Sequence, residues 1–451
     1  MKRLAILTPL VALATTLIPS SVVFAQPAGD EVLLQMQQAS RKQDIRALTT
    51  LLPAIQGHPL EVWGHYWALK ARLSSATAQE VEDFLQRWRG TYQEDRLRND
   101  WLLLLGQRRN WAEFERLHTE FRMQDDKQLR CYDLAIASIE GRLPQHASTE
   151  LQQLWMGQPA NDDGCTYAAS TLYAAEQLPA LAVWQRARLG AERNQLSTAR
   201  NALAIVAPQH VAALAGLFKS PQAYLSNPKT TPPPALATLA LVRLASSDPD
   251  QAAQLLRTRW QQSLSAEEQH WVWGMIGKVA ARRLSDNALD YFAQVKQLTD
   301  LNDDSLAWLA RAALRAGQWD KVQRAIAAMS PAQQQDSTWV YWQARALLTQ
   351  GTPADQARAQ ALLGSIAGVD GFYEQLAAED LGQAVLPPPE PQPPTAEEIA
   401  RAHANPGLTR ALYAIRIGLR SEGVREWNYT TNLHQPGGMQ DRDLLAAAAI
   451  A

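Results

Sequence analysis

The sequence predicts an all-α protein made of stacked helical hairpins, and three observations support this prediction. The segment 308–312 (WLARA) returns 34 residues later as 342–346 (WQARA), and Gly317 returns at the same interval as Gly351. The apolar residues between the two copies recur at helical spacing. Runs of alternating β-branched residues are nearly absent, whereas the helix-favouring Ala, Leu, Gln and Arg dominate.

Each repeat unit is predicted to contain a helix, a turn and a second helix. The apolar stripe of one second helix consists of Val322, Ala325, Ile326 and Met329. Gly317 is expected to end the first helix with a positive φ, and Ser330-Pro331 to close the second. A period of 34 residues is typical of tetratricopeptide-like arrays. Because one hairpin cannot cover its own apolar face, we expect a superhelix with a continuous core.

The repeat continues elsewhere in degenerate form. Trp273 precedes Trp308 by 35 residues, and Trp184 and Arg200 have the same spacing as Trp342 and Arg358. Most of the chain is therefore expected to form hairpins of varying length. Asp30 is expected to cap the first of these helices.

The first 25 residues have the pattern of a secretory leader. Lys2 and Arg3 precede an apolar stretch at 4–17, and 23–25 (VFA) is a small-x-small cleavage site, so cleavage is expected after Ala25. The apolar stretch is too short and interrupted for a membrane span, and no later stretch reaches membrane length. No Cys follows the cleavage site, so we expect a periplasmic protein without a membrane anchor.

Cys131 and Cys165 are the only cysteines, so one intrachain disulfide is possible. In an oxidising compartment we expect it to form, with a stabilisation of roughly 3.5–4 kcal/mol in the chain-entropy model. The alternative is a pair of buried free thiols. A catalytic or metal-binding role is less favoured, because neither Cys has a His at ligand spacing.

Three regions follow the predicted leader (1–25). The superhelical domain is expected at 26–382, a proline-rich linker at 383–395, and a small helical domain at 396–451. The linker contains the sequence LPPPEPQPP, which favours a semi-rigid extended chain. Thr395 and Glu398 resemble a capping box at the start of the last region. The formal net charge of −2 argues against nucleic acid as a partner.

Catalytic and metal-binding motifs are absent from the sequence. It contains no HExxH, no GxSxG, no phosphate-binding loop and no Cys/His ligand group, so no metal and no cofactor are expected. One polar cluster could suggest calcium: Asp300, Asn302, Asp303 and Asp304. It lacks the Gly and the distal Glu of a calcium loop, so we favour a helix cap before Leu306.

The 15 tryptophans and two repeat-position arginines each allow two interpretations. The tryptophans could stack on sugar rings or on a partner, but their recurrence on the apolar stripe favours filling gaps between hairpins. Arg311 and Arg345 could meet carboxylates of a polymer's peptides. The favoured interpretation is that their stems lie over the helix surface, where the charge is solvated or paired.

Two segments resemble a known family. The segment 371–382 (GFYEQLAAEDLG) resembles a segment of the soluble periplasmic lytic transglycosylases. The segment 411–418, followed by 423–428 (GVREWN), is similar to that family's linker domain, where a helix precedes a G-x-x-R-E-W motif. The segment 441–446 (DRDLLA) looks like the start of that domain's last helices. The leader, the two cysteines and the array also fit this family.

The resemblance implies a role in cell-wall turnover. Members of the family are lyases that cleave the bond between N-acetylmuramic acid and N-acetylglucosamine in peptidoglycan and leave 1,6-anhydro products. One glutamic acid acts as acid and base, without a metal. The superhelix is implied to form a ring that holds the glycan strand. The linker domain joins it to a lysozyme-like catalytic domain.

The sequence departs from this pattern at the catalytic motifs. The family's Glu-Ser pair and Gly-Leu-Met-Gln motif are missing, and 437–440 (GGMQ) is only an echo of the latter. The chain ends at Ala451 within a predicted helix, before the expected catalytic domain. We therefore assign no catalytic residue, and the residues that contact substrate stay unassigned.

We expect the superhelical and linker regions of a lytic transglycosylase that bind peptidoglycan glycan strands without cleaving them. Other cell-wall enzymes are further candidate partners. A second hypothesis is a periplasmic tetratricopeptide-like scaffold for protein contacts, without glycan affinity. A third is a non-functional remnant, which predicts poor solubility.

Overall fold

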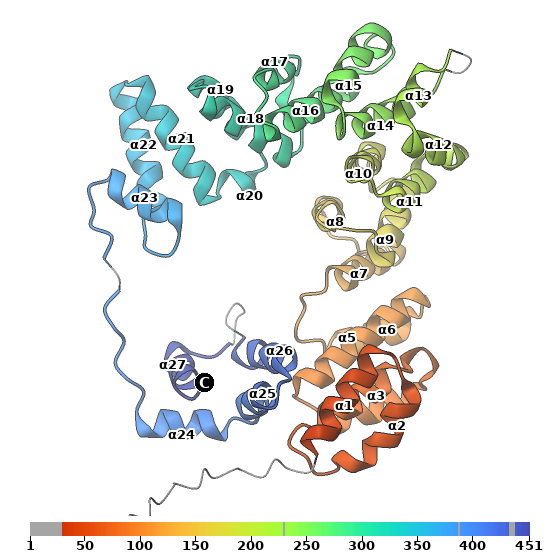
Figure 1. Cartoon of the computed structure of the whole chain (residues 1–451), viewed down its shortest axis with the longest axis vertical. Coiled ribbons are helices and arrows are strands. Elements are labelled where there is room, and N and C mark those ends of the chain that lie inside the picture. The colour runs from red at the N-terminus through yellow and green to blue at the C-terminus, as the bar shows by residue number, and fades with distance from the viewer. Residues whose placement is uncertain (1–28, 229–230, 387, 433–437) are drawn as a thin grey trace, which may run out of the picture. The chain divides into compact units, whose positions relative to one another are not determined.

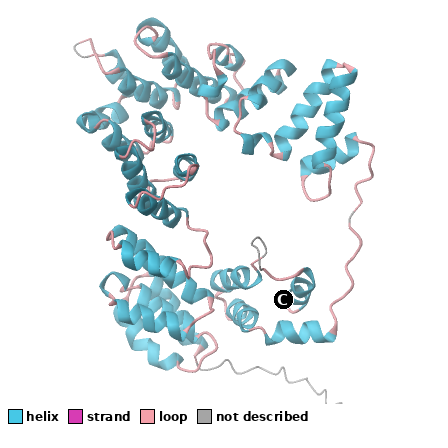
Figure 2. Cartoon of the chain, turned by 180° about the vertical axis from the view of Figure 1, so that it is seen from behind, coloured by secondary structure: helices cyan, strands magenta, loops and turns pink. Residues whose placement is uncertain are grey.

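The computed structural model describes residues 29–228, 231–386, 388–432 and 438–451 (Figure 1). Within these ranges every regular element is a helix and none is a strand, as the colouring of Figure 2 shows. The all-α prediction is therefore confirmed. The predicted leader lies outside the described residues. Among the helices that the structure describes, none combines the length and the apolar character needed to cross a membrane.

The chain divides into two compact units, and each is described by itself. The terminal unit combines the residues up to Trp101 with Pro393–Ala451. The central unit comprises Leu102–Gln392. Residues 383–386 and 388–395, in the proline-rich segment, form neither helix nor strand.

The terminal unit is built from helices near both ends of the sequence. Its first group is α1 (Asp30–Arg41), α2 (Ile45–Leu51), α3 (Glu61–Lys70), α4 (Ala78–Arg87) and the first part of α5 (Tyr92–Gln107). Its second group is α24 (Ala396–Ala404), α25 (Pro406–Arg416), α26 (Arg420–Thr431) and α27 (Asp441–Ala449). Thr395 and Glu398 form the predicted capping box at the start of α24. Asn405 caps α25, with Pro406 at its first position.

The central unit is a succession of helical hairpins. Its first half contains α6 (Trp111–His118), α7 (Lys127–Ile139), α8 (Ala147–Met156), α9 (Asp163–Ala174), α10 (Ala180–Glu192), α11 (Leu196–Val206), α12 (Leu214–Lys219), α13 (Pro221–Ser226) and α14 (Pro234–Ala245). Its second half contains α15 (Pro249–Leu255), α16 (Ala266–Arg282), α17 (Ala288–Phe292), α18 (Asp303–Arg315), α19 (Trp319–Ala327), α20 (Pro331–Gln334), α21 (Ser337–Gln350), α22 (Pro353–Ile366) and α23 (Phe372–Asp380).

The 34-residue repeat corresponds to two consecutive hairpins, α18–α19 and α21–α22. Gly317 follows α18 with φ +65°, and Gly351 follows α21 with φ +77°. Both glycines therefore supply the left-handed turn that the sequence predicted. The closing role expected for Ser330-Pro331 is corrected, because α19 already ends at Ala327. Ser330 instead caps the short helix α20, whose first residue is Pro331.

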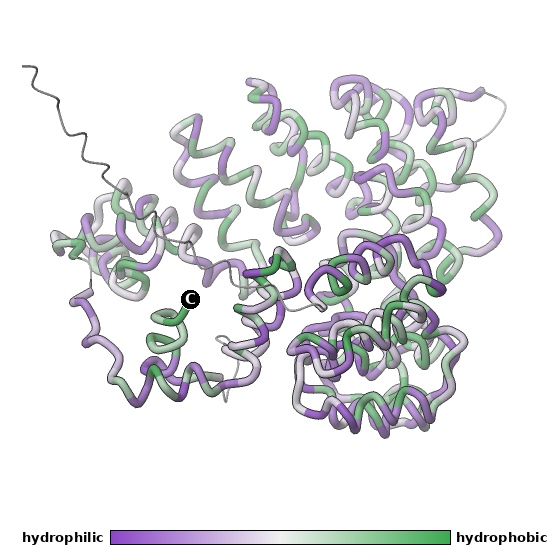
Figure 3. Tube along the Cα trace, turned by 60° about the horizontal axis from the view of Figure 1, so that its bottom comes forward, coloured by the Kyte–Doolittle hydropathy of each residue, from purple (hydrophilic) through white to green (hydrophobic). Residues whose placement is uncertain are grey.

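Buried apolar side chains extend along most of the array, as expected for stacked hairpins. One cluster of buried apolar side chains extends from Cys131 to Ala346, and a smaller one at Tyr341–Ala377 follows it. Val322, Ala325 and Ile326, predicted to form an apolar stripe, are fully buried. Apolar and polar positions alternate along the helices in Figure 3, as two-faced helices require.

Candidate functional site

Glu426, in the segment 423–428, is a fully buried carboxylate of the terminal unit. Its Oε2 accepts hydrogen bonds from Trp63 Nε1 on α3 at 3.1 Å and from Gln93 Nε2 on α5 at 2.8 Å. Its Oε1 accepts one from Arg410 Nε on α25 at 2.6 Å. The contacts join α26 to three other helices. A general acid or base must reach a substrate atom, so Glu426 is a structural group.

Asp30 is a second buried carboxylate of this unit, and its predicted capping role is wrong. The residue before α1 is Gly29, and no side chain caps this helix. Asp30 Oδ1 is instead 2.9 Å from His58 Nε2 and accepts a hydrogen bond from the Tyr413 hydroxyl at 2.8 Å. Burial, together with the hydrogen bond to Asp30, raises the pKa of Tyr413. The carboxylate thus connects α1 to α25.

Arg442, in the segment 441–446, links α27 to α24. Its guanidinium binds both carboxylate oxygens of Glu398, with Nε at 3.0 Å from Oε1 and Nη2 at 2.6 Å from Oε2. This hydrogen bond from Arg442, with the backbone N–H of Thr395, lowers the pKa of Glu398 to about 2. A two-point pair of this kind fixes the orientation of both side chains.

The segment 371–382 of the central unit contains α23, and two of its aromatic residues meet two from α21. We call this group the aromatic site: Tyr341, Trp342, Phe372 and Tyr373. Trp342 Nε1 donates to the Tyr373 hydroxyl at 3.3 Å. The Phe372 ring meets the Tyr373 ring edge-on, with centroids 5.2 Å apart, and is 70% exposed. The site therefore presents one open ring supported by other rings. An aromatic face of this kind attracts the C–H groups on the apolar face of a sugar.

The two repeat-position arginines lie over the helix surface. Arg345 Nη1 is 3.1 Å from Asp380 Oδ2 and 3.2 Å from the Tyr341 hydroxyl. The Arg311 guanidinium lies over the rings of Trp308 and Trp339, at 5.0 and 5.3 Å from their centroids. These contacts agree with the favoured interpretation and add cation–π contacts to it.

The tryptophans mainly fill the protein interior. Eight of them are buried: Trp63, Trp67, Trp101, Trp155, Trp260, Trp271, Trp273 and Trp339. Trp308 and Trp342 are partly buried and pack against the core cluster of the central unit. Burial supports the gap-filling interpretation, and the exposed aromatic side chain near the resemblance segment is a phenylalanine, Phe372.

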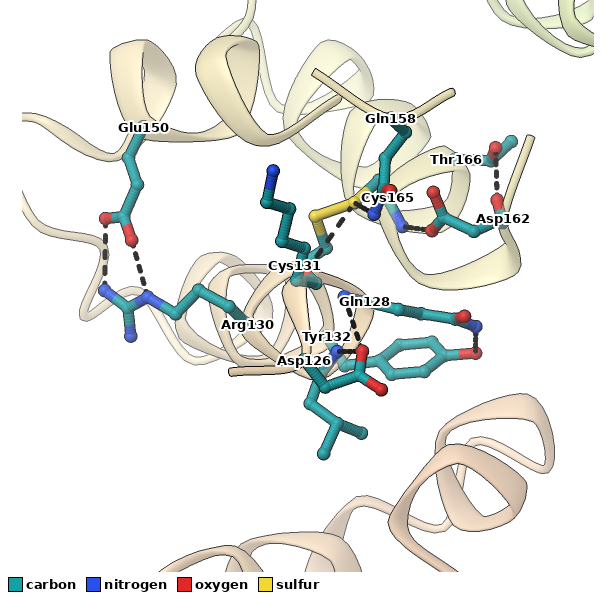
Figure 4. Close-up of a disulfide and its surroundings, with 12 residues drawn as sticks. Asp126, Gln128, Arg130, Cys131, Tyr132, Glu150, Gln158, Asp162, Cys165 and Thr166 are labelled. Carbon is teal, nitrogen blue, oxygen red and sulfur yellow. Dashed lines mark hydrogen bonds and ion pairs between the residues drawn. A yellow bond between two sulfur atoms is a disulfide. The ribbon is translucent and has the colours of Figure 1, made fainter. Parts of the chain in front are cut away.

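Cys131 on α7 and Cys165 on α9 form the predicted disulfide (Figure 4). The sulfur atoms are 2.04 Å apart, the Cα atoms are 4.8 Å apart, and both residues are fully buried. Asp162 caps α9 by accepting from the Cys165 backbone N–H at 2.7 Å. Burial raises the pKa of Asp162. The alternative of two free thiols is thereby excluded.

The acidic cluster at the start of α18 contains a helix cap, a contact between Asp300 and His270, and an ion pair between Asp304 and Lys278. Asn302 caps α18 by accepting from the Ser305 backbone N–H at 2.8 Å, as expected. Asp300 Oδ2 is 2.6 Å from His270 Nδ1, and Asp304 Oδ2 is 2.9 Å from Lys278 Nζ. In the part of the chain that the structure describes, no group of His, Cys, Asp and Glu side chains is arranged to hold a metal ion.

Sequence reasoning did not find the partners of Glu426 or the exposure of Phe372. Trp63 lies 363 residues from Glu426 in the chain, so no local pattern could connect them. The resemblance segment contains Phe372, but periodicity does not reveal which of two adjacent aromatic residues faces solvent.

No protein-family model and no curated protein matches the sequence. Among solved structures, the lytic transglycosylase Slt of Pseudomonas aeruginosa, an inactive mutant, matches with a TM-score of 0.55 and 24% identity. The match covers 93% of this chain and 68% of that one. The 70-kDa soluble lytic transglycosylase of Escherichia coli matches with a TM-score of 0.49, 17% identity and coverages of 93% and 67%. A complex of the 70-kDa soluble lytic transglycosylase with bulgecin A matches with a TM-score of 0.48 and 17% identity, and the match covers 93% of this chain and 67% of that one. The protein is therefore similar in fold to the lytic transglycosylase of Pseudomonas aeruginosa over most of its length.

Proposed function

We propose that this chain is a peptidoglycan-binding protein with the superhelical and linker architecture of the soluble lytic transglycosylases, acting in the periplasm. The observation that carries the proposal is the fold likeness to the Pseudomonas aeruginosa lytic transglycosylase over 93% of this chain. The segments 371–382 and 423–428 add a sequence resemblance to the same family. The disulfide agrees with an oxidising compartment.

We assign binding to these residues and no cleavage. No residue of the sequence matches the family's Glu-Ser pair. Among the described residues four glutamates are buried, and each has a structural partner. Glu94 Oε1 pairs with Arg98, and Glu426 accepts from Trp63, Gln93 and Arg410. Glu268 accepts from the Ser265 backbone N–H, and Glu422 accepts from Gln37. Cleavage of a glycosidic bond needs a carboxyl group that can protonate the leaving oxygen.

The aromatic site is our candidate contact for the glycan. Phe372 offers an open ring, and Tyr373 and Trp342 support it. Arg345, which contacts the Tyr341 hydroxyl of the aromatic site, pairs with Asp380 and provides polar groups. An apolar ring face beside charged hydrogen-bonding groups suits a sugar, which has both apolar and hydroxyl-bearing sides.

Co-sedimentation with purified murein sacculi tests the proposal. We expect the chain to pellet with the sacculi, and the Phe372→Ala variant to bind about three- to tenfold more weakly, since one stacked ring contributes on the order of 1 kcal/mol. Ile139→Ala is the matched control, because Ile139 is also an exposed apolar residue of the central unit, at 52%. Its binding should equal that of the unmodified chain.

Two results would count against the proposal. If the chain stays entirely in the supernatant, it has no affinity for peptidoglycan. The hypothesis of a scaffold for protein contacts would then replace the proposal of peptidoglycan binding. Release of 1,6-anhydro muropeptides from sacculi by this chain alone would contradict the assignment of binding without cleavage.

A further inference from the structure

A hollow of about 660 Å³ opens in the central unit among α17, the short 3-10 helix η5 (Leu298–Asp300), α18 and α19. Its lining includes the nearly buried apolar side chains of Phe292, Val295 and Leu309. Its volume lies within the roughly 300–1,000 Å³ of small-ligand sites. We call it the basic hollow because of its charged residues.

Three cationic side chains line the basic hollow: Lys296, Lys321 and Arg324. No acidic side chain lines it. Lys321 and Arg324 are three residues apart on α19, so they share one face of that helix. The core residues Val322, Ala325 and Ile326 occupy the adjoining face of the helix. Lys321 and Arg324 therefore line the hollow, while the buried residues of α19 pack in the core.

The carboxylates of η5 and α18 near the basic hollow are bound by other residues, and Asp320 on α19 does not line this hollow. Asp300 is bound to His270, Asp303 accepts from Ser330, and Asp304 pairs with Lys278. Lys296 Nζ donates to the backbone carbonyl oxygen of Ala293 at 3.2 Å and not to a carboxylate. Three cations beside apolar side chains create a positive potential that an anionic ligand would satisfy.

A second hollow of about 420 Å³ adjoins the same cations. Its lining includes Trp319, Thr349, Lys321 and Arg324, so the last two side chains border both hollows, whereas the acidic residue Asp320 lines the second hollow alone. A ligand that uses both hollows must be extended and must carry its negative charge near the middle. A short peptide meets this requirement, whereas a single inorganic anion does not.

We propose that the basic hollow binds a short acidic peptide that carries an apolar side chain. Its carboxylates would receive charge-assisted hydrogen bonds from Lys321 and Arg324, and its apolar side chain would lie against Phe292, Val295 and Leu309. Resting on the proposed function, the peptide class is that of the stem peptides attached to peptidoglycan glycan strands. The chain would then contact the polymer's peptides as well as its sugars.

Calorimetric titration with a purified stem tetrapeptide tests the basic hollow alone. We expect the full chain to bind the peptide, and the double variant K321A/R324A to bind at least about tenfold more weakly, because two charged contacts are lost. Higher salt should weaken binding to the unmodified chain, since the contacts are near the surface. Equal affinity of K321A/R324A and the unmodified chain would overturn the proposal.

The matched control is the double variant R200A/K219A. Both residues are exposed cations of the central unit that lie outside the two hollows. R200A/K219A removes the same number of positive charges as K321A/R324A but leaves the hollows intact, so its peptide affinity should be unchanged. An equal loss of affinity in both variants would mean that net charge, and not the basic hollow, determines peptide binding. Circular dichroism should show native helix content for both variants, because alanine favours helices.

Sacculi stripped of their peptides by an amidase separate this inference from the proposed function. We expect K321A/R324A to be retained more weakly than the unmodified chain on intact sacculi but to match it on stripped sacculi. Equal retention of both proteins on both materials would overturn the proposal that the basic hollow binds the peptides, while the proposed function would still hold. Tetrapeptide binding without retention on either material would support the hollow and contradict the proposed function.

Discussion

At the scale of single residues, Glu426 is the most constrained charge in the terminal unit. It is fully buried, and its two oxygens accept from Trp63, Gln93 and Arg410. A buried ion pair is costly to break on one side, because the remaining charge keeps its desolvation cost without its partner. Removing the negative charge of Glu426 would leave the Arg410 guanidinium without its charged partner.

We predict that Glu426→Gln lowers the free energy of unfolding by about 3 kcal/mol. The amide keeps the shape of the side chain but cannot neutralise Arg410, and its NH2 group opposes one of the donors. Urea denaturation followed by circular dichroism measures the change. Glu397→Gln, at an exposed position of α24, is the control and should change stability by less than about 0.5 kcal/mol. Equal midpoints for the two variants would show that the Glu426 contacts are not stabilising.

The sequence indicated some of these residues but not their contacts. The segment 423–428 could be recognised, whereas Gln93 is 333 residues away from Glu426. Asp30 shows the same limit. The capping rule is local, and it failed because His58 and Tyr413 provide donors that only the folded chain brings close. The Cys131–Cys165 pair was predictable because the sequence offers no other pairing.

At the scale of elements, Gly351 and Gly364 of the second repeat hairpin differ in their backbone conformation and in whether a side chain would be tolerated. Gly351 ends α21 with φ +77°, a conformation that costs other residues roughly 1–2 kcal/mol. Gly364 lies within α22, and an added Cβ would meet no atom within 4 Å. The same substitution should therefore act in opposite directions at the two positions.

We predict that Gly351→Ala destabilises the protein by about 1 kcal/mol. Gly364→Ala should stabilise it by about 0.5–1 kcal/mol, because alanine has the higher helix propensity. Thermal unfolding monitored by circular dichroism gives both values in one experiment. Similar shifts of the same sign would contradict the assignment of Gly351 to a left-handed turn.

The pair formed by Glu398 and Arg442 makes the packing of α24 against α27 dependent on pH. The pKa of Glu398 is lowered from its usual 4.5 to about 2. A carboxyl group with a lowered pKa stabilises the folded state fully above its unfolded pKa and loses this contribution as pH falls through its folded pKa. The loss is therefore expected between about pH 4.5 and pH 2.

Hydrogen exchange of α24 and α27 at pH 5 and at pH 2.5, corrected for the intrinsic exchange rates, measures this effect. We expect protection to decrease at the lower pH in the unmodified chain. The Arg442→Ala variant should be less protected at pH 5 and should show a smaller further decrease. Identical pH dependence in the two proteins would mean that the ion pair does not hold these helices together.

Helix boundaries followed from the sequence where the signal was local. Asp248 caps α15, whose first residue is Pro249, and such an Asp-Pro pair is a local start signal. The π-helical turn at Leu256–Trp260, which follows α15, has no comparable signature and was not predicted. Sequence analysis did not single out Lys321 and Arg324 on α19, and the hollow that they line depends on η5, which is not part of the repeat.

At the scale of the whole molecule, periodicity predicted the all-α array and its continuous core, because each hairpin must cover its neighbour's apolar face. Periodicity could not show which helices share a compact unit with residues 396–451. The structure groups them with the residues up to Trp101 through contacts between segments more than 300 residues apart in the chain. Such contacts depend on the complete path of the chain and have no local signal.

Export is a further prediction for the whole chain. The pattern at 1–25 predicts removal of the leader after Ala25. N-terminal sequencing of the protein isolated from the periplasm of its host should therefore begin at Gln26. A protein recovered only from the cytoplasm with Met1 or Lys2 at its start would contradict export, and it would also remove the oxidising compartment expected for the disulfide.

The most direct test of the central claim is a binding isotherm on purified sacculi, with mass spectrometry of the soluble fraction from the same samples. We predict saturable binding of the chain to the polymer and no 1,6-anhydro muropeptides in solution. Absence of saturable binding would contradict the proposed peptidoglycan function, and 1,6-anhydro products would contradict the assignment of binding without cleavage.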